Sequence, residues 1–371
     1  MSETAFVVIF PSAFSKNKQS VLIANVRKIL KIQNQSYQKI ATDDDLITID
    51  ANDPVFASSA VNLLFGISRV SIARRVENKY DTVVSAIARI GASLLLSGEQ
   101  FHVKVEGAST GYIPKDVEIA ATSALIEKTH EMGCRPGSEE KHDKQIHCFL
   151  TRKNAYISIF SDRGHGGVPY NSQGEQAVCC IHDELSAVSC IESIKQGFDA
   201  KMLVCYNDAN LMELVKLTNR IIPRTMSGAV TIEFFKVPTK DTATSILQRA
   251  LVATKLSCRI AKKQKIPRVC IGLSPLTHPV WFIDQNTSLV AKDKLAPWVP
   301  LAGLDDEIIR TAKEMGLGKY LHKIERLGAL KFAKNIPDIS DILSQAERTH
   351  QTVTVKVGPN NIHDILDALK H

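Results

Sequence analysis

A regular alternation of apolar strands and helices in the second half of the chain constrains the fold most. Runs such as 177–181 and 201–206 are almost wholly apolar, and a segment with helical spacing of its apolar residues follows each. Strands buried on both faces have this composition, and helices between them connect parallel strands. The pattern predicts strands at 177–181, 201–206, 230–234, 268–271 and 352–357 and helices at 185–195, 211–220, 242–262, 305–314 and 362–369.

Residues 175–371 are therefore expected to form a doubly wound parallel sheet, preceded by two smaller α/β units. The first unit has predicted strands at 5–10 and 46–50 and helices at 21–32 and 58–64. The second has predicted helices at 82–96 and 116–129 and strands at 101–105, 146–150 and 155–161. Segment 163–174 contains four glycines and a proline, which predicts a boundary linker.

Composition excludes several classes of protein. A chain of 371 residues that is 44% hydrophobic and 23% charged is typical of two or three folded domains, not of a disordered or collagen-like chain. No apolar run has the length of a membrane helix, and the first ten residues lack the basic start of a secretion signal. The eight cysteines lie mostly inside apolar runs, as reduced thiols do, so a cytoplasmic location is expected and no membrane partner.

The positive charge is unevenly distributed. Residues 1–174 contain 20 basic and 18 acidic residues, whereas residues 175–371 contain 26 and 21. The excess is concentrated in six basic residues with no acid between them, namely Lys255, Arg259, Lys262, Lys263, Lys265 and Arg268. This balance permits a polyanionic partner without requiring one.

Several stretches resemble the tRNA 4-thiouridine synthetases (tRNA sulfurtransferases). They are the layout of 101–129 and the segments Phe65-Gly66-Ile67, Gly166-Gly167-Val168-Pro169…Gln173-Gly174 and Pro300-Leu301-x-Gly303-Leu304-Asp305. The resemblance implies an N-terminal ferredoxin-like domain at 1–65 and a THUMP RNA-binding domain at 66–170. It further implies a PP-loop ATP pyrophosphatase-like domain at 175–371, without an additional rhodanese domain.

The nucleotide site implied by the resemblance has diverged. The family's motif is Ser-Gly-Gly-x-Asp-Ser, whose glycines let backbone amides close on the ATP phosphates. The matching stretch here is Ile181-His182-Asp183-Glu184-Leu185-Ser186, in which only Ser186 agrees with the motif. A second segment that contacts the nucleotide in the family retains only its glycine, Gly272. Two carboxylates beside a triphosphate cost on the order of 1–4 kcal/mol, so we interpret these residues as a degenerate nucleotide-binding site. Two interpretations of this segment are possible: a new acid/base site, or a loop in which Asp183 or Glu184 caps the following helix. We favour the helix cap.

The sulfur chemistry of the family also lacks its residues. The family's catalytic cysteine aligns near Ala329, no cysteine follows Cys270, and there is no Cys-x-x-Cys pair. No metal site is expected. The potential zinc ligands Cys134, His142, His147 and Cys148 are not spaced along the chain as in common zinc sites. We therefore assign no catalytic residue and no cofactor; ATP with Mg²⁺ is expected only if the chain is an active enzyme.

The expected partner is tRNA, because the resemblance implies an RNA-binding domain and because lysine and arginine bind phosphates. The candidate RNA contacts are Lys16, Lys18, Lys104, Arg152, Lys153, Lys262 and Lys263. A solvated charged surface is the alternative interpretation of these cations.

The resulting hypothesis is a tRNA-binding, non-catalytic or diverged paralogue acting in tRNA modification. Two alternatives remain open: an active ATP-dependent tRNA sulfurtransferase with a diverged nucleotide site and a separate sulfur carrier, or a regulatory or scaffold partner of a genuine synthetase. A homodimer is also open.

Overall fold

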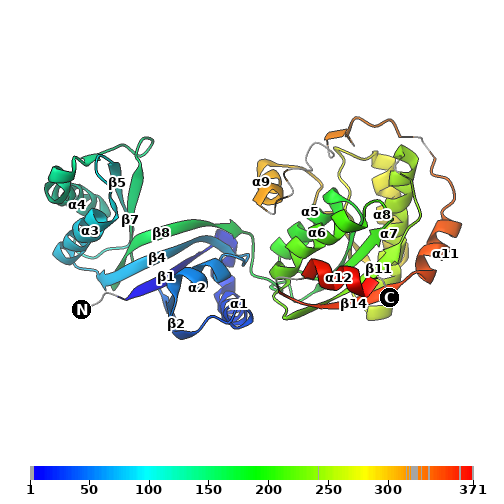
Figure 1. The fold of residues 1–371 in the computed structure, drawn as a ribbon, viewed down its shortest axis with the longest axis horizontal. Helices are drawn as coiled ribbons and strands as arrows, with labels where there is room; N and C mark the ends of the chain where they lie inside the picture. The colour runs from blue at the N-terminus through cyan, green and yellow to red at the C-terminus, as the bar shows by residue number, and fades with distance from the viewer. Residues whose placement is uncertain are drawn as a thin grey trace. The chain divides into compact units, whose positions relative to one another are not determined.

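The chain forms two compact units in the computed structural model. The structure describes residues 4–240, 242–314, 316, 318, 325–326, 328–332, 335–358 and 361–369. Unit 1 comprises residues 1–166 and unit 2 comprises residues 167–371 (Figure 1). We describe each unit by itself.

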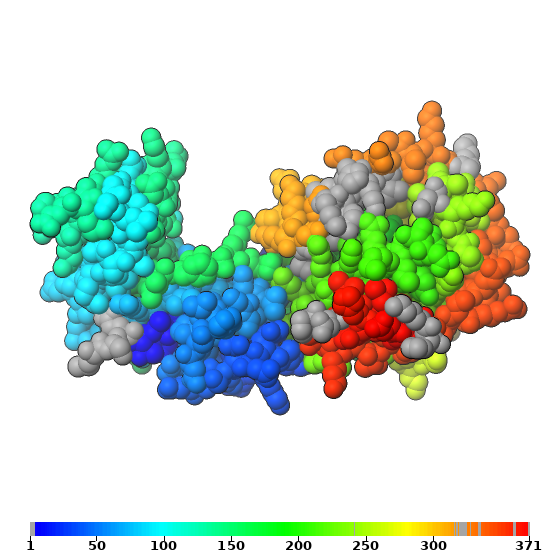
Figure 2. Space-filling model, viewed as in Figure 1, coloured from blue at the N-terminus to red at the C-terminus, as the bar shows by residue number. Residues whose placement is uncertain are grey.

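Unit 1 contains an eight-stranded sheet in the order β2-β3-β1-β4-β8-β7-β5-β6. Its strands are β1 Ala5–Pro11, β2 Tyr37–Asp43, β3 Leu46–Ala51, β4 Ile67–Glu77, β5 Gln100–Gly107, β6 Arg135–Pro136, β7 Lys144–Leu150 and β8 Asn154–Gly166. Its helices are η1 Ala13–Lys18, α1 Gln19–Ile32, α2 Pro54–Val61, α3 Tyr80–Leu94, α4 Pro114–Thr129 and η2 His130–Met132. In the space-filling view α3–α4 and α1–α2 cover separate parts of this unit (Figure 2). One sheet thus runs through both domains expected in this half of the chain, and their division at residue 65 stays a prediction.

One face of this sheet carries no helix among the described residues. On the covered face, α3 and α4 pack on β5 and β7 through a core that includes Val103 and Ile146. On the other face, Val8, Phe10 and Tyr156 belong to a cluster that contains no helical residue. The strand register places alternate residues of neighbouring strands on this same face, which we call the helix-free face.

The β2–β3 turn folds across the helix-free face. The Asp43 carboxylate accepts hydrogen bonds from the Thr151 hydroxyl at 3.0 Å, the Asn154 amide at 2.8 Å and the Tyr156 hydroxyl at 2.6 Å. Three strands separate β2 from β8 in the sheet, so these bonds require the sheet to curl. Burial, followed by the Asp43 contact, raises the pKa of the Tyr156 phenol, which therefore stays a hydrogen-bond donor.

Unit 2 contains a six-stranded sheet in the order β13-β12-β9-β10-β11-β14. Its strands are β9 Gln176–Ile181, β10 Asp199–Tyr206, β11 Ala229–Lys236, β12 Arg268–Cys270, β13 Ala296–Trp298 and β14 Gln351–Lys356. Its helices are α5 Glu184–Lys195, α6 Leu211–Ile221, η3 Ile222–Thr225, α7 Ala243–Gln264, α8 Val280–Lys292, α9 Asp306–Glu314, α11 Ser340–Arg348 and α12 Asn361–Leu369. Val178 and Cys180 face α7, whereas Cys270 on the next strand contacts Ser189 of α5, so helices cover both faces. The doubly wound prediction is confirmed.

The prediction of a wholly parallel sheet is wrong at one edge. Strand β14 pairs antiparallel with β11, from Ala229 opposite Lys356 to Phe234 opposite Gln351. The alternation of apolar residues along a strand is the same in both directions, so the sequence pattern did not distinguish them.

The predicted linker begins too early. Residues 163–166 complete β8, where Arg163 pairs with Arg69 and Gly166 pairs with Ile67. A Cβ on Gly164 would lie 2.3 Å from the Ile67 carbonyl oxygen, so the glycine allows close strand pairing here instead of ending the strand.

Two other predictions are corrected by local chemistry. The helix predicted at 58–64 begins at Pro54, because the Asp53 side chain accepts hydrogen bonds from the amides of Val55 and Phe56. Strand β4 was missed, since its three arginines hide the apolar alternation. Strand β2 and the helices α8 and α11 were missed as well.

We predict that Asp43→Ala destabilises unit 1 by about 2–3 kcal/mol, because three donors lose a charged acceptor. The matched control is Asp45→Ala, whose carboxylate is 73% exposed and pairs only with Lys16 among the described residues. The control should cost less than about 1 kcal/mol. Urea unfolding measures the free energy of unfolding of both variants. Equal losses in the two variants would contradict the proposal that the hydrogen bonds of Asp43 hold the curled sheet together.

Candidate nucleotide pocket and nucleic-acid interface

The residues predicted for the degenerate nucleotide site, namely 181–184, Ser186 and Gly272, lie together at the carboxyl edge of the unit 2 sheet. Ile181 ends β9, Asp183 is the N-cap of α5, and Gly272 follows the adjacent parallel strand β12. A Cβ on Gly272 would lie only 2.6 Å from the Ser186 Cβ. The loop after β12 therefore packs directly on the first turn of α5.

Three backbone amides at the start of α5 are hydrogen-bonded within the segment itself. The Ser186 hydroxyl oxygen accepts hydrogen bonds from the amides of His182 at 2.9 Å and Asp183 at 3.0 Å. The Asp183 carboxylate accepts one from the Ser186 amide at 2.8 Å. This arrangement is a capping box, so the prediction that Asp183 caps the helix is confirmed.

Two buried histidines complete this region. His182 is 5% exposed and its Nδ1 lies 3.5 Å from an Asp183 carboxylate oxygen. His278, which the sequence analysis did not single out, is 4% exposed and its Nδ1 lies 2.9 Å from the Thr277 hydroxyl. Its ring stacks on Phe282 and Phe332, and its Nε2 has no hydrogen-bond partner in the described part of the chain.

The electrostatics favour neutral imidazoles beside an ionised carboxylate. Burial lowers the pKa of both His182 and His278. Burial alone would raise the pKa of Asp183, but His182 and the hydrogen bonds from Ser186 outweigh it and lower the net pKa. The Ser186 hydroxyl donates to the Asp183 carbonyl, so it is not activated by a histidine.

The cysteines are poor nucleophiles. All eight are buried and free, and the Cys180 and Cys205 sulfur atoms lie 3.3 Å apart. Burial raises the pKa of the Cys180 and Cys270 thiols, which disfavours the reactive thiolate. Ala329, near which the resemblance predicts the family's cysteine, is exposed.

Three of the predicted RNA contacts gather around the β2–β3 turn. Lys16 pairs with Asp45 at 3.0 Å, and Arg152 pairs with Asp44 at 2.8 Å. Arg152 and Lys153 also line a hollow of about 470 Å³ beside this turn. Hydrogen bonds from Arg152 lower the pKa of the Asp44 carboxyl, so this ion pair is charged at neutral pH.

The other predicted contacts lie elsewhere. Lys18 ends η1, and Lys104 lies on β5, where it pairs with Glu139 at 2.7 Å. Lys262 and Lys263 are in the last turn of α7, and Lys262 pairs with Asp293 at 2.5 Å.

Two arginines that sequence reasoning missed lie over aromatic rings on the helix-free face. The Arg69 guanidinium is 3.9 Å from the centre of the Phe10 ring, and that of Arg75 is 4.4 Å from the Phe6 ring. Lys104 belongs to the same face, because it pairs in register with His147, whose Nε2 lies 3.4 Å from Arg69. A strand pairing of β1 with β4 is the signal that would have revealed them.

Curated proteins with detectable similarity are named probable tRNA sulfurtransferases. That of Methanosarcina acetivorans is 23% identical over 191 residues, or 51% of this chain and 46% of the relative, and that of Methanosarcina mazei is 24% identical over 184 residues. The match spans less than half the length of these two relatives. The Thermococcus kodakarensis protein is 22% identical over 318 residues, covering 80% of this chain and 82% of the relative. No protein-family model matches the chain.

Among solved structures, a 4-thiouridine synthetase–RNA complex with bound ATP aligns with 95% of this chain and 100% of its own, at a TM-score of 0.64 and 14% identity. The fold is that of a 4-thiouridine synthetase. PH1313 from Pyrococcus horikoshii shares it, with a TM-score of 0.62 and 16% identity over 84% of this chain and 99% of its own.

The 4-thiouridine synthetase fold confirms the α/β class expected from the sequence. None of the helices within the described ranges is long and apolar enough to cross a membrane.

We predict that unit 2 loses stability as the pH falls from 7 to 5. The unfolded histidines take up protons near their ordinary pKa of about 6.5, whereas buried His182 and His278 resist protonation. Each histidine should contribute a loss of up to about 2 kcal/mol over this range. Urea unfolding of His182→Gln and His278→Gln should show a shallower pH dependence, while exposed His363→Gln serves as the control. A pH dependence that neither variant reduces would contradict this account.

Proposed function

We propose that this chain is a tRNA-binding protein of the tRNA 4-thiouridine synthetase type that is non-catalytic or diverged and acts in tRNA modification. The domain assignment carried by this proposal is ferredoxin-like at 1–65, THUMP at 66–170 and a degenerate PP-loop domain at 175–371. Similarity to proteins named tRNA sulfurtransferases and to a synthetase bound to RNA supports it. The eight buried free thiols fit a reducing compartment, so we place the protein in the cytoplasm.

Three occupied amides around the N-cap of α5 carry the non-catalytic part of the proposal. Free amides at a helix N-terminus are what bind phosphate groups. Here the amides of His182, Asp183 and Ser186 already bond within the capping box. A triphosphate would have to break these bonds and approach the ionised Asp183 carboxylate, which disfavours ATP twice over.

The helix-free face of unit 1 carries the RNA-binding part. Arg69 and Arg75 each lie over an aromatic ring, so their guanidinium groups are held in place while remaining partly exposed. Arginine in this setting binds phosphates and stacks on bases. The predicted cations Lys16, Lys104 and Arg152 have acidic partners, but surface ion pairs contribute only about 0–1 kcal/mol and can be exchanged for phosphate.

The proposal predicts that Mg-ATP does not bind with a dissociation constant below about 1 mM, because three amides at the start of α5 are occupied and a carboxylate would face the phosphates. Isothermal titration calorimetry measures this, with the Thermococcus kodakarensis relative as the parallel sample. Micromolar binding that His182→Gly/Asp183→Gly alters would instead favour the alternative of an active sulfurtransferase with a diverged site.

For RNA, Arg69→Gln/Arg75→Gln should weaken binding of a tRNA transcript by about tenfold and lower the salt slope by about 1.5. The control Arg27→Gln/Lys28→Gln removes the same charge from exposed positions of α1. Circular dichroism checks that both variants fold. If the wild-type chain binds tRNA no better than heparin, with the same salt slope, the RNA-binding proposal fails. Capture of a genuine synthetase without RNA would then favour the regulatory alternative.

A further inference from the structure

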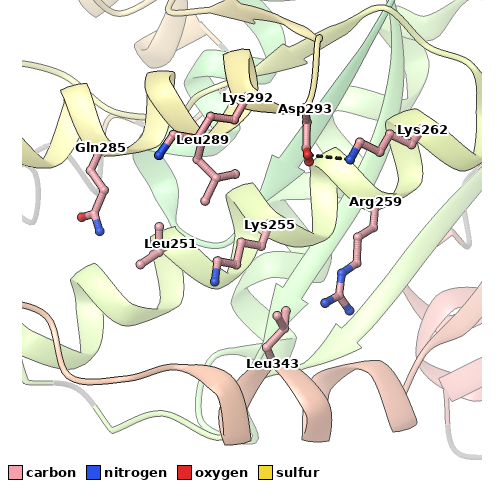
Figure 3. A pocket seen from close by; sticks show the side chains of 9 residues that line it. All are labelled: Leu251, Lys255, Arg259, Lys262, Gln285, Leu289, Lys292, Asp293 and Leu343. Carbon is pink, nitrogen blue, oxygen red and sulfur yellow. Dashed lines mark hydrogen bonds and ion pairs between the residues drawn. The ribbon is translucent and has the colours of Figure 1, made fainter.

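A basic groove of about 580 Å³ lies on unit 2 between α7, α8 and α11, away from the capped turn of α5 (Figure 3). Its lining consists of eight residues of these helices and Asp293, which follows α8. The nine residues are Leu251, Lys255, Arg259, Lys262, Gln285, Leu289, Lys292, Asp293 and Leu343. Four of the nine are basic and one is acidic.

Helical spacing brings the cations to the groove from both sides. Lys255, Arg259 and Lys262 are four and three residues apart, so they form one stripe along α7. Lys292 comes from the last turn of α8, and Figure 3 shows it and Lys255 extending between the helices. The fold thus adds to the basic run a cation that is distant in sequence.

Two of these cations are already paired and two are not. Arg259 forms an ion pair with Glu347 of α11, and Lys262 pairs with Asp293 at 2.5 Å. Neither Lys255 nor Lys292 has an ion-pair partner among the residues that the structure describes. Hydrogen bonds from Ser340 and, to a smaller degree, the Lys255 charge lower the pKa of the Asp338 carboxyl. The groove therefore presents two cations without a close ion pair among the described residues, of which Lys255 also interacts with Asp338 at longer range.

The floor of the groove argues for phosphates over an apolar or aromatic ligand. Leu251 and Leu343 are only 5% and 7% exposed, so among the three lining leucines only half-buried Leu289 offers a side chain to an amphipathic helix. None of the lining residues is aromatic, so the groove offers no platform on which bases could stack. Positive charge is what remains for recognition.

We propose that this groove is a second RNA contact, which binds backbone phosphates independently of sequence and uses Lys255 and Lys292 as its main ligands. This proposal rests on the proposed tRNA binding and adds a site in unit 2. The proposal assigns only part of the basic run 255–268 to the groove. Arg268 instead pairs with Glu175 at 2.9 Å, and Lys263 lines a neighbouring hollow beside Phe235.

The test is tRNA binding across a salt series by full-length Lys255→Gln/Lys292→Gln. We expect binding to weaken about tenfold at moderate salt and the slope of log K against log salt to fall by about 1.5, since about two phosphate contacts are lost. The matched control is Lys216→Gln/Lys356→Gln, which removes the same charge from exposed positions of α6 and β14. The control should change the slope by much less.

The outcomes separate the groove from the proposed function. A wild-type chain that does not bind tRNA specifically overturns both proposals. Specific wild-type binding with an unchanged slope in Lys255→Gln/Lys292→Gln overturns only the groove. Groove-dependent binding of poly-glutamate that is tighter than that of tRNA would assign the groove to an acidic protein segment and also overturn this inference.

Discussion

The capping box at the start of α5 is the interaction that determines how the carboxyl edge of the unit 2 sheet is packed. Asp183 and Ser186 exchange hydrogen bonds that close the first turn of the helix, and the loop at Gly272 packs on the outside of that turn. The carboxyl edge of a parallel sheet is where such folds place ligands. Here the edge has become a packed part of the core, with His182 and His278 buried beside it.

Unit 1 uses a carboxylate differently. Asp43 joins the β2 edge of a curled sheet to β8, while the neighbouring Asp44 and Asp45 pair with Arg152 and Lys16. The same short turn therefore closes the sheet and places cations at its rim. This explains how a unit with nearly balanced charge presents positive groups at defined positions.

Much of unit 2 could be predicted from the sequence, because strands such as β9 are apolar on both faces. The segment from Ile181 to Ser186 was also singled out without coordinates, through its resemblance to a glycine motif, and its assignment as a degenerate nucleotide site stays a prediction. Strand β4 could not be recognised, because Arg69 and Arg75 interrupt its apolar pattern. Rings on β1 accommodate both arginines, and Arg69 also pairs with Glu106 of β5. His278 was missed for a similar reason, as its burial depends on contacts with Phe282 and Phe332 that follow from the packing of α8.

The contact between Gly272 and Ser186 has a consequence for how this chain can evolve. A Cβ on Gly272 would lie 2.6 Å from the Ser186 Cβ, so position 272 takes no larger residue unless the first turn of α5 moves. Glycine in place of Asp183 would remove the side chain that caps this turn. The turn and the loop after β12 must therefore change together, and substitutions that arise one at a time at this edge of the sheet lose stability.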